Sequence, residues 1–141
     1  MSFFYSDKNA GVIKEELLTD KAIQWAKGFL NPQRPRDRRQ KNPKLTSAQL
    51  RKFHSEAKEL EARTKTMKQP DDFYKLRPLV KMLKSKAAYS CPATGRERKI
   101  PVEFKQFIDE MVDHVNDLKD FQAFCLCFEA VVGFFYGQGG R

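Results

Sequence analysis

Apolar residues recur three or four positions apart through most of this 141-residue chain, which is the spacing that places them on one face of an α-helix. No segment shows a convincing alternation of apolar and polar residues, so we expect no β-strand. The first helix is predicted at about residues 9–30, with a break that Thr19 caps. About five helices with mostly short connections favour an all-α fold, arranged as a compact antiparallel bundle.

Proline and short polar side chains divide the central part of the chain. Residues 46–49 follow the capping-box pattern, with Thr46 at the N-cap and Gln49 three positions later, and the second helix ends before Pro70. The third helix starts near Asp71 and begins or kinks at Pro78. The predicted core positions of these two helices are Leu50, Phe53, Ala57, Leu60, Met67, Phe73, Leu76, Leu79, Val80, Leu83 and Ala87.

The remaining segments complete a single helical domain over residues 1–141. Residues 90–99 read as a loop, Pro101 opens a fourth helix, and the last helix follows a turn at 116–117 and ends at Gly137. The segment 31–43 has three prolines and almost no apolar residue, so we expect a basic, extended or disordered linker. Residues 137–141 are rich in glycine and are predicted to form a flexible tail.

Cysteine usage and hydropathy indicate the cellular compartment in which the protein is expected. The longest conspicuous apolar run is 131–136, far short of the ~20 residues of a membrane span, and the first residues do not resemble a signal peptide. The three cysteines show neither zinc nor redox spacing, and an odd number of them favours reduced thiols. We therefore expect a cytoplasmic protein without a membrane partner.

Charge is unevenly distributed along the chain. Residues 31–99 hold 20 Lys and Arg against 7 Asp and Glu, whereas residues 100–141 carry 3 basic and 7 acidic residues. A concentrated field of one sign attracts polyanions, and phosphates dominate the affinity of nucleic-acid binding. The central block therefore predicts a nucleic-acid-binding protein.

Within the second and third helices, cations gather beside the predicted core stripes. The ridge of the second helix consists of Ser47, Arg51, His54, Lys58 and Lys65, and that of the third of Arg77, Lys81 and Lys84. We expect these ridges to be parallel and to frame one groove for a polyanion. The alternative is that long basic side chains cover apolar edges of the bundle.

Catalytic and metal-binding patterns are not evident. His54 and His114 fall on different helices without a nucleophile motif, and we expect no catalytic site, metal or cofactor. The fourth helix has an outer acidic face, which consists of Asp109, Glu110, Asp113 and Asp117. This face is either solvated or a surface for a partner. Trp25 and the tyrosines can stack on bases, although Trp25 at the edge of an apolar face is more typical of a core residue.

Three segments in order resemble one family. Residues 44–53 (KLTSAQLRKF) are similar to the opening helix motif of the Csm small subunit of type III-A CRISPR effector complexes. Residues 76–89 (LRPLVKMLKSKAAY), followed by Gly95 and Arg96, resemble its second signature, and residues 128–137 (FEAVVGFFYG) resemble its terminal helix. The likeness covers roughly residues 44–137; it departs from the pattern in a longer insert at 90–94 and does not extend to the linker.

This resemblance implies a small all-helical subunit without catalytic activity. Several copies would stack along a filament of backbone subunits and line the groove that holds guide RNA paired to target RNA, while neighbouring subunits cut. By position, the family's basic contacts fall on Lys44, Arg51, Arg77, Lys81, Lys84, Lys86 and Arg96. The angular pattern singles out most of these, except that Lys86 lies away from the ridge.

Three hypotheses follow for the function. The leading one is a non-catalytic RNA-binding subunit of a ribonucleoprotein complex, with guide RNA, target RNA, larger subunits and further copies of itself as partners. The second is a DNA-binding regulator that reads bases with the second helix. The third is a protein-interaction bundle that docks through its basic linker.

Overall fold

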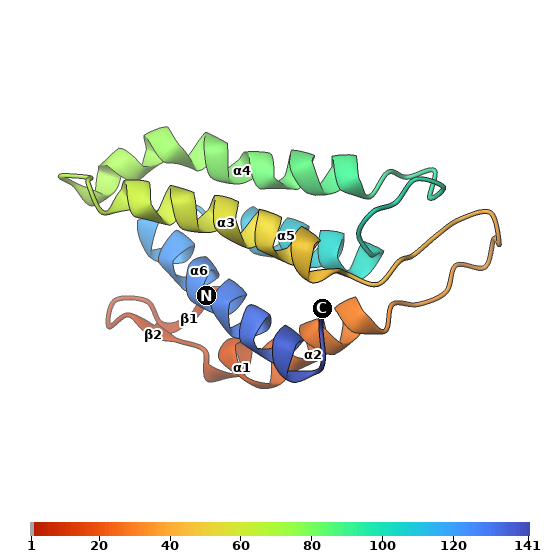
Figure 1. Ribbon diagram of the computed structural model, residues 1–141. Helices are drawn as coiled ribbons and strands as arrows, with labels where there is room; N and C mark the ends of the chain where they lie inside the picture. The colour runs from red at the N-terminus through yellow and green to blue at the C-terminus, as the bar shows by residue number, and fades with distance from the viewer. Residues whose placement is uncertain (1) are drawn as a thin grey trace.

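The computed structural model describes residues 2–141 and confirms the all-α fold (Figure 1). Its longer helices are α2 (Asp20–Leu30), α3 (Ser47–Thr64), α4 (Phe73–Ser90), α5 (Val102–Asp113) and α6 (Leu118–Gly137). The shorter elements are β1 (Tyr5–Asp7), β2 (Val12–Ile13), α1 (Glu15–Leu18) and the 3₁₀ turn η1 (Pro70–Asp72). The bundle of about five helices is therefore as expected.

Helix α6 runs through the middle of the bundle. It packs against α3 on one side and against α1 and α2 on the other, while α4 packs on α5 and α3. Figure 1 shows α3 and α4 side by side, with α6 crossing beneath them. The linker after α2 and the loop after α4 extend from the same end of the molecule.

The N-terminal segment corrects the sequence-based expectation. Residues 9–14 are not helical, because β1 and β2 pair in an antiparallel hairpin that joins Tyr5 to Ile13. Gly11 adopts φ 72° in the turn, a conformation that glycine reaches without a steric penalty. The break at Thr19 is present between α1 and α2, but the Thr19 hydroxyl donates to the Glu15 carbonyl (2.9 Å) and does not cap α2.

Four positions in and around α3 and α4 also differ from the expectation. Helix α4 continues through Pro78, which falls in its second turn and removes a single backbone hydrogen-bond donor. Leu79 is 41% exposed, because it lies at the edge of the core stripe and faces the gap toward α3. Met67 and Leu60 are only partly buried, and Met67 follows the end of α3.

Phenylalanine rings form the centre of the core. The Phe128 ring of α6 lies 5.5 Å from Phe107 and 6.3 Å from Phe104, both on α5, and 5.8 Å from Phe124, measured between centroids. Phe53 of α3 lies 5.2 Å from Phe104. The Trp25 ring lies 5.0 Å from the Phe107 ring, so Trp25 is partly buried and packs against the core. One cluster of rings thus joins four helices.

The linker and the C-terminal residues are tied to the bundle. Asn42 accepts a hydrogen bond from the Val102 amide (2.7 Å) and so satisfies an N–H group in the first turn of α5. Glu103 accepts from Asn42 (2.9 Å) and from the Gln33 amide (2.8 Å), although residues 31–46 contain no helix or strand. The glycines of residues 137–141 predicted a flexible tail. Instead, the tail folds back onto the start of α3, where the Ser47 amide donates to the Arg141 carbonyl (2.8 Å).

No helix within residues 2–141 has the length and apolar character that crossing a bilayer requires.

Replacing Phe128 by Ala should lower the free energy of unfolding by about 3–5 kcal/mol, since the substitution leaves a cavity at the junction of α3, α5 and α6. Leu126→Ala is the matched control, because Leu126 lies on the same helix and is 47% exposed. That variant should change the free energy by no more than about 0.5 kcal/mol. Urea unfolding followed by circular dichroism measures both, and equal effects would contradict the central role of the Phe128 ring.

Candidate nucleic-acid interface

The predicted ridge of α3 lies on the side of the helix that faces α6, whereas Lys52 faces α4. The His54 ring lies 5.2 Å from the Phe128 ring, and Lys58 lies with Glu61 and Glu129 around a shallow depression between α3 and α6. Arg51 and Lys58 are exposed, and neither forms an ion pair within the described chain. The Arg51 Nε donates only to the Ser47 carbonyl of its own helix (3.4 Å).

Three basic residues form a row on this side. Arg51, Lys58 and Lys65 follow one another at intervals of seven residues. Seven residues are almost two helical turns, so Arg51 and Lys58 lie about 10.5 Å apart along α3 on nearly the same side. Lys65 continues the row because its backbone is still helical at the C-cap. We call these three residues the α3 row. Lys44 precedes the helix, where the backbone is extended, and is exposed.

His54 lies on the same side of α3 but does not contribute a positive charge there. Burial lowers the pKa of the His54 ring, the Lys58 charge lowers it further, and Glu129 and Glu61 oppose these effects. The ring is therefore neutral at neutral pH. The His54 ring packs against the Phe128 ring, so we do not count it among the cations of this side.

The lowered pKa of His54 makes the stability depend on pH in a defined direction. Between the native pKa and the ordinary value of 6.5, the unfolded chain binds more protons than the folded one. The free energy of unfolding should therefore fall as the pH decreases through this window, and His54→Gln should reduce that slope. A titration of the His54 ring by NMR provides the direct check, and a pKa of 6.5 or higher would contradict the interpretation.

The predicted ridge of α4, which is Arg77, Lys81 and Lys84, points toward α5 and away from α3. Arg77 donates to the Asn116 carbonyl (3.1 Å), Lys81 donates to the Val112 carbonyl (2.7 Å), and Lys84 forms an ion pair with Asp113. Their partners lie at the C-terminal end of α5 and in the turn that follows it. The two basic ridges therefore occupy opposite flanks of the α3–α4 pair, and the predicted groove framed by both ridges is wrong.

Helix geometry explains this placement. The last carbonyl groups of a helix have no partner within the helix and carry partial negative charge, so basic side chains bind them favourably. Lys81 is partly buried in that position, and burial lowers the pKa of its ammonium group although Asp113 opposes the change. A helical wheel of α4 alone shows a free ridge because it contains no information about α5.

Lys81→Met should lower the free energy of unfolding by about 1 kcal/mol, because the Val112 carbonyl loses its charged donor and keeps the backbone hydrogen bond from the Val115 amide (3.1 Å). Lys75→Met is the matched control, since Lys75 is an exposed lysine on the same helix. It should shift the free energy by less than about 0.5 kcal/mol. Denaturant unfolding of both variants decides whether Lys81 supports the fold, and equal stabilities would contradict that role.

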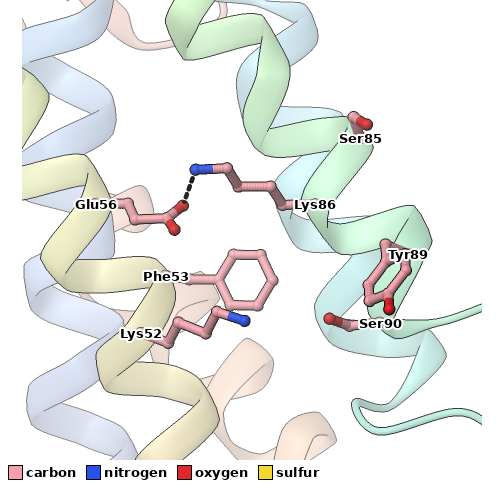
Figure 2. Close-up of a pocket in the computed structure, with 7 residues that line it drawn as sticks. All are labelled: Lys52, Phe53, Glu56, Ser85, Lys86, Tyr89 and Ser90. Carbon is pink, nitrogen blue, oxygen red and sulfur yellow. Dashed lines mark ion pairs between the residues drawn. The ribbon is translucent and has the colours of Figure 1, made fainter.

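Lys86 lies apart from the other three cations, as its position on the wheel indicated, and its side chain reaches toward α3. Its Nζ is 2.8 Å from Glu56 Oε2, and the pair closes one end of a pocket between the two helices (Figure 2). The pocket has a volume of about 320 Å³ and is lined by Lys52, Phe53 and Glu56 of α3 and by Lys86, Tyr89 and Ser90 of α4. Sequence reasoning noted that tyrosines can stack on bases but did not single out Tyr89.

Arg96 lies in the loop after α4, which is joined to the linker. The Lys41 amide donates to the Gly95 carbonyl (2.7 Å), and the Arg98 Nη1 donates to the Lys41 carbonyl (3.3 Å). Gly95 has φ 76°, and a Cβ there would stand 2.8 Å from the Gln40 Cγ, so glycine fits both the conformation and the contact. Arg96 itself is exposed and makes no ion pair within residues 2–141.

The acids of α5 and the start of α6 are largely used inside the molecule. Asp109 pairs with Lys105 (2.6 Å), Asp113 with Lys84, and Asp117 with Lys8 (2.7 Å). The buried Asp120 also binds Lys8 (3.1 Å), which attaches the N-terminal hairpin to α6. Burial raises the pKa of Asp117, but the Lys8 ammonium and the hydrogen bonds with Asp120 together hold the pKa below its ordinary value.

Residues 2–141 include no cluster of three or more His, Cys, Asp or Glu side chains that could hold a metal ion. The three cysteines are free and buried, and burial raises the pKa of each thiol.

Comparison with known families decides the identity. The family model described as Csm2 Type III-A matches residues 35–140, which is most of the chain. The chain belongs to the Csm2 family. Comparisons with curated proteins and with solved structures give no match. Membership in the Csm2 family makes the chain a small subunit of a type III-A CRISPR complex, working with the other Csm subunits. The match begins inside the linker and includes α3 to α6.

Proposed function

We propose that this Csm2-family subunit binds RNA without catalysing a reaction and that it contacts the duplex of guide RNA and target RNA through phosphates. Several copies would stack along the complex beside backbone and large subunits, in the cytoplasm, as part of antiviral defence. Family membership supports the setting of this proposal. The α3 row is the observation that supports RNA contact.

The α3 row fits a phosphate chain because its charges are free and regularly spaced. Arg51 and Lys58 form no ion pair within the described residues, in contrast to Lys84 and Lys86. Cations without internal partners repel one another, and a polyanion along the row relieves that repulsion while it releases counterions. Contacts to the sugar-phosphate backbone position a protein but do not read bases, so we expect no sequence preference.

The candidate contacts divide into two groups. The first group is free of internal ion pairs, lies on the α3 side or in the joined loops, and consists of Lys44, Ser47, Arg51, Lys58 and Arg96. In the second group, Arg77, Lys81, Lys84 and Lys86 each contact another part of the fold. We assign the phosphate contacts to the first group, with the second supporting the positions of α4 and α5.

Charge reversal along the α3 row tests this proposal. Arg51→Glu combined with Lys58→Glu should weaken binding to an RNA duplex at every salt concentration. If four to six phosphates are contacted, log K falls with log salt at a slope of about −3 to −5, and the double variant should reduce that slope by about 2. Fluorescence anisotropy with a labelled duplex, measured over a series of salt concentrations, gives both quantities.

Lys21→Glu combined with Lys27→Glu is the charge-matched control, because both lysines are exposed on α2, across α6 from α3. This control should keep most of the affinity and the full salt slope. Equal losses of affinity and of salt slope in the two double variants would show that only net charge matters and would contradict the proposed role of the α3 row. A selected DNA duplex that outcompetes random duplexes would favour a DNA-binding regulator instead. Capture of Csm subunits with no RNA binding would favour a protein-interaction bundle.

A further inference from the structure

The pocket between α3 and α4 combines an aromatic wall with a basic rim. Tyr89 is 82% exposed, although large apolar rings are usually covered in a folded chain, and it stands across the pocket from the buried Phe53 (Figure 2). We propose that this pocket binds an unpaired nucleotide of RNA, with the base stacked on Tyr89. The inference rests on the proposed RNA-binding function and adds a second, separate site to it.

Ser90 adds a polar group to the wall of the pocket. The residue is only 5% exposed, and Figure 2 shows its hydroxyl directed into the pocket. Its backbone carbonyl accepts from the Lys99 amide (2.7 Å), which joins this wall to the segment that carries Lys99. A ligand with donors and acceptors on a planar edge can form a hydrogen bond with the Ser90 hydroxyl.

The charges around the pocket fit an anion. Lys52 and Lys86 stand on its rim, and Lys99 Nζ lies 6.0 Å from the centroid of the Tyr89 ring. Glu56 is the carboxylate among the lining residues, and it is paired with Lys86. The three lysines therefore exceed the acids by two charges. A phosphate can bind Lys52 or Lys99, while the Glu56 carboxylate can accept from an exocyclic amine of a base.

Aromatic stacking with lysine neighbours is the usual chemistry of single-strand recognition. Each nucleobase has a π-face, so a tyrosine ring accepts any of them, and unpaired bases are the ones free to leave a helix and stack on protein. The volume of about 320 Å³ lies at the lower end of the range for small-molecule sites, which fits one nucleotide better than a peptide helix. These features favour a nucleotide over a protein segment.

The pocket and the α3 row lie on different sides of α3. Lys52 and Glu56 face α4, whereas His54 and Lys58 face α6. A duplex along the row and an unpaired nucleotide in the pocket would therefore contact the same helix from two flanks. Substitutions in one site can be made without touching the other, which separates the two proposals experimentally.

Tyr89→Ala should weaken binding of a labelled single-stranded RNA 12-mer of mixed sequence by about 5- to 150-fold, the range for the loss of one base–aromatic stack. It should leave the affinity for a blunt RNA duplex within about twofold. Tyr74→Ala is the matched control, because Tyr74 is another exposed tyrosine of α4 (65%) that does not line the pocket. That variant should bind both RNAs as the unmodified chain does, and Tyr89→Phe should retain single-strand binding.

Photo-crosslinking of the full chain to the same 12-mer carrying 5-iodouridine supplies a readout independent of affinity. The modified base should attach to residues 87–96, a tryptic peptide in which Tyr89 is the only aromatic residue. Equal single-strand affinities of Tyr89→Ala and Tyr74→Ala would overturn the proposal that the pocket binds a nucleotide. That result would not affect the proposal that the α3 row contacts a duplex. Loss of Csm subunit capture by Tyr89→Ala with unchanged RNA binding would overturn it in favour of a protein contact. If the α3 row variants bind the duplex as the unmodified chain does, while Tyr89→Ala weakens single-strand binding, the duplex proposal is rejected and the pocket is supported.

Discussion

The contact of Phe128 with the rings of α5 and with His54 of α3 is the constraint on which the arrangement of this molecule depends. Helix α6 carries Phe128 through the centre of the bundle, and the ring meets Phe104 and Phe107 on one side and His54 on the other. Because the His54 ring packs against this ring, the side of α3 that bears Arg51 and Lys58 is fixed beside α6. The apolar core thereby sets the direction in which the free cations of α3 point, and the proposed RNA contact follows from packing.

Local sequence signals predicted most of the helices and their ends. Thr46 caps α3, since the Gln49 amide donates to the Thr46 hydroxyl (3.2 Å), but the reciprocal bond of a capping box is missing because Gln49 Oε1 has no hydrogen-bond partner within residues 2–141. Pro101 and Gly137 mark helix ends as expected. The hairpin at Tyr5–Ile13 escaped notice because its strands are too short to show alternation, and its stability comes from Lys8 and Tyr5 contacts with residues more than a hundred positions away. Such contacts leave no periodic trace in the chain.

The candidate site was only partly predictable for a similar reason. A helical wheel places residues around one axis, so it identified Arg51 and Lys58 beside the core of α3, and it placed Lys86 away from the other α4 cations. It could not show that Arg77 and Lys81 bind carbonyl groups near the end of α5, because that depends on which helix packs there. The same limit hid the pocket at Tyr89, whose walls come from two helices. Basic residues of this chain thus serve two purposes, and only the neighbouring helix distinguishes them.

The three cysteines have a practical consequence. Cys91, Cys125 and Cys127 are at most 8% exposed, and burial disfavours their thiolate forms. Maleimide reagents attack thiolates, so the native thiols should stay unmodified while the chain is folded. A single cysteine introduced on the surface can therefore carry a fluorophore or spin label without prior removal of the natural ones, which opens the subunit to distance measurements inside a larger assembly.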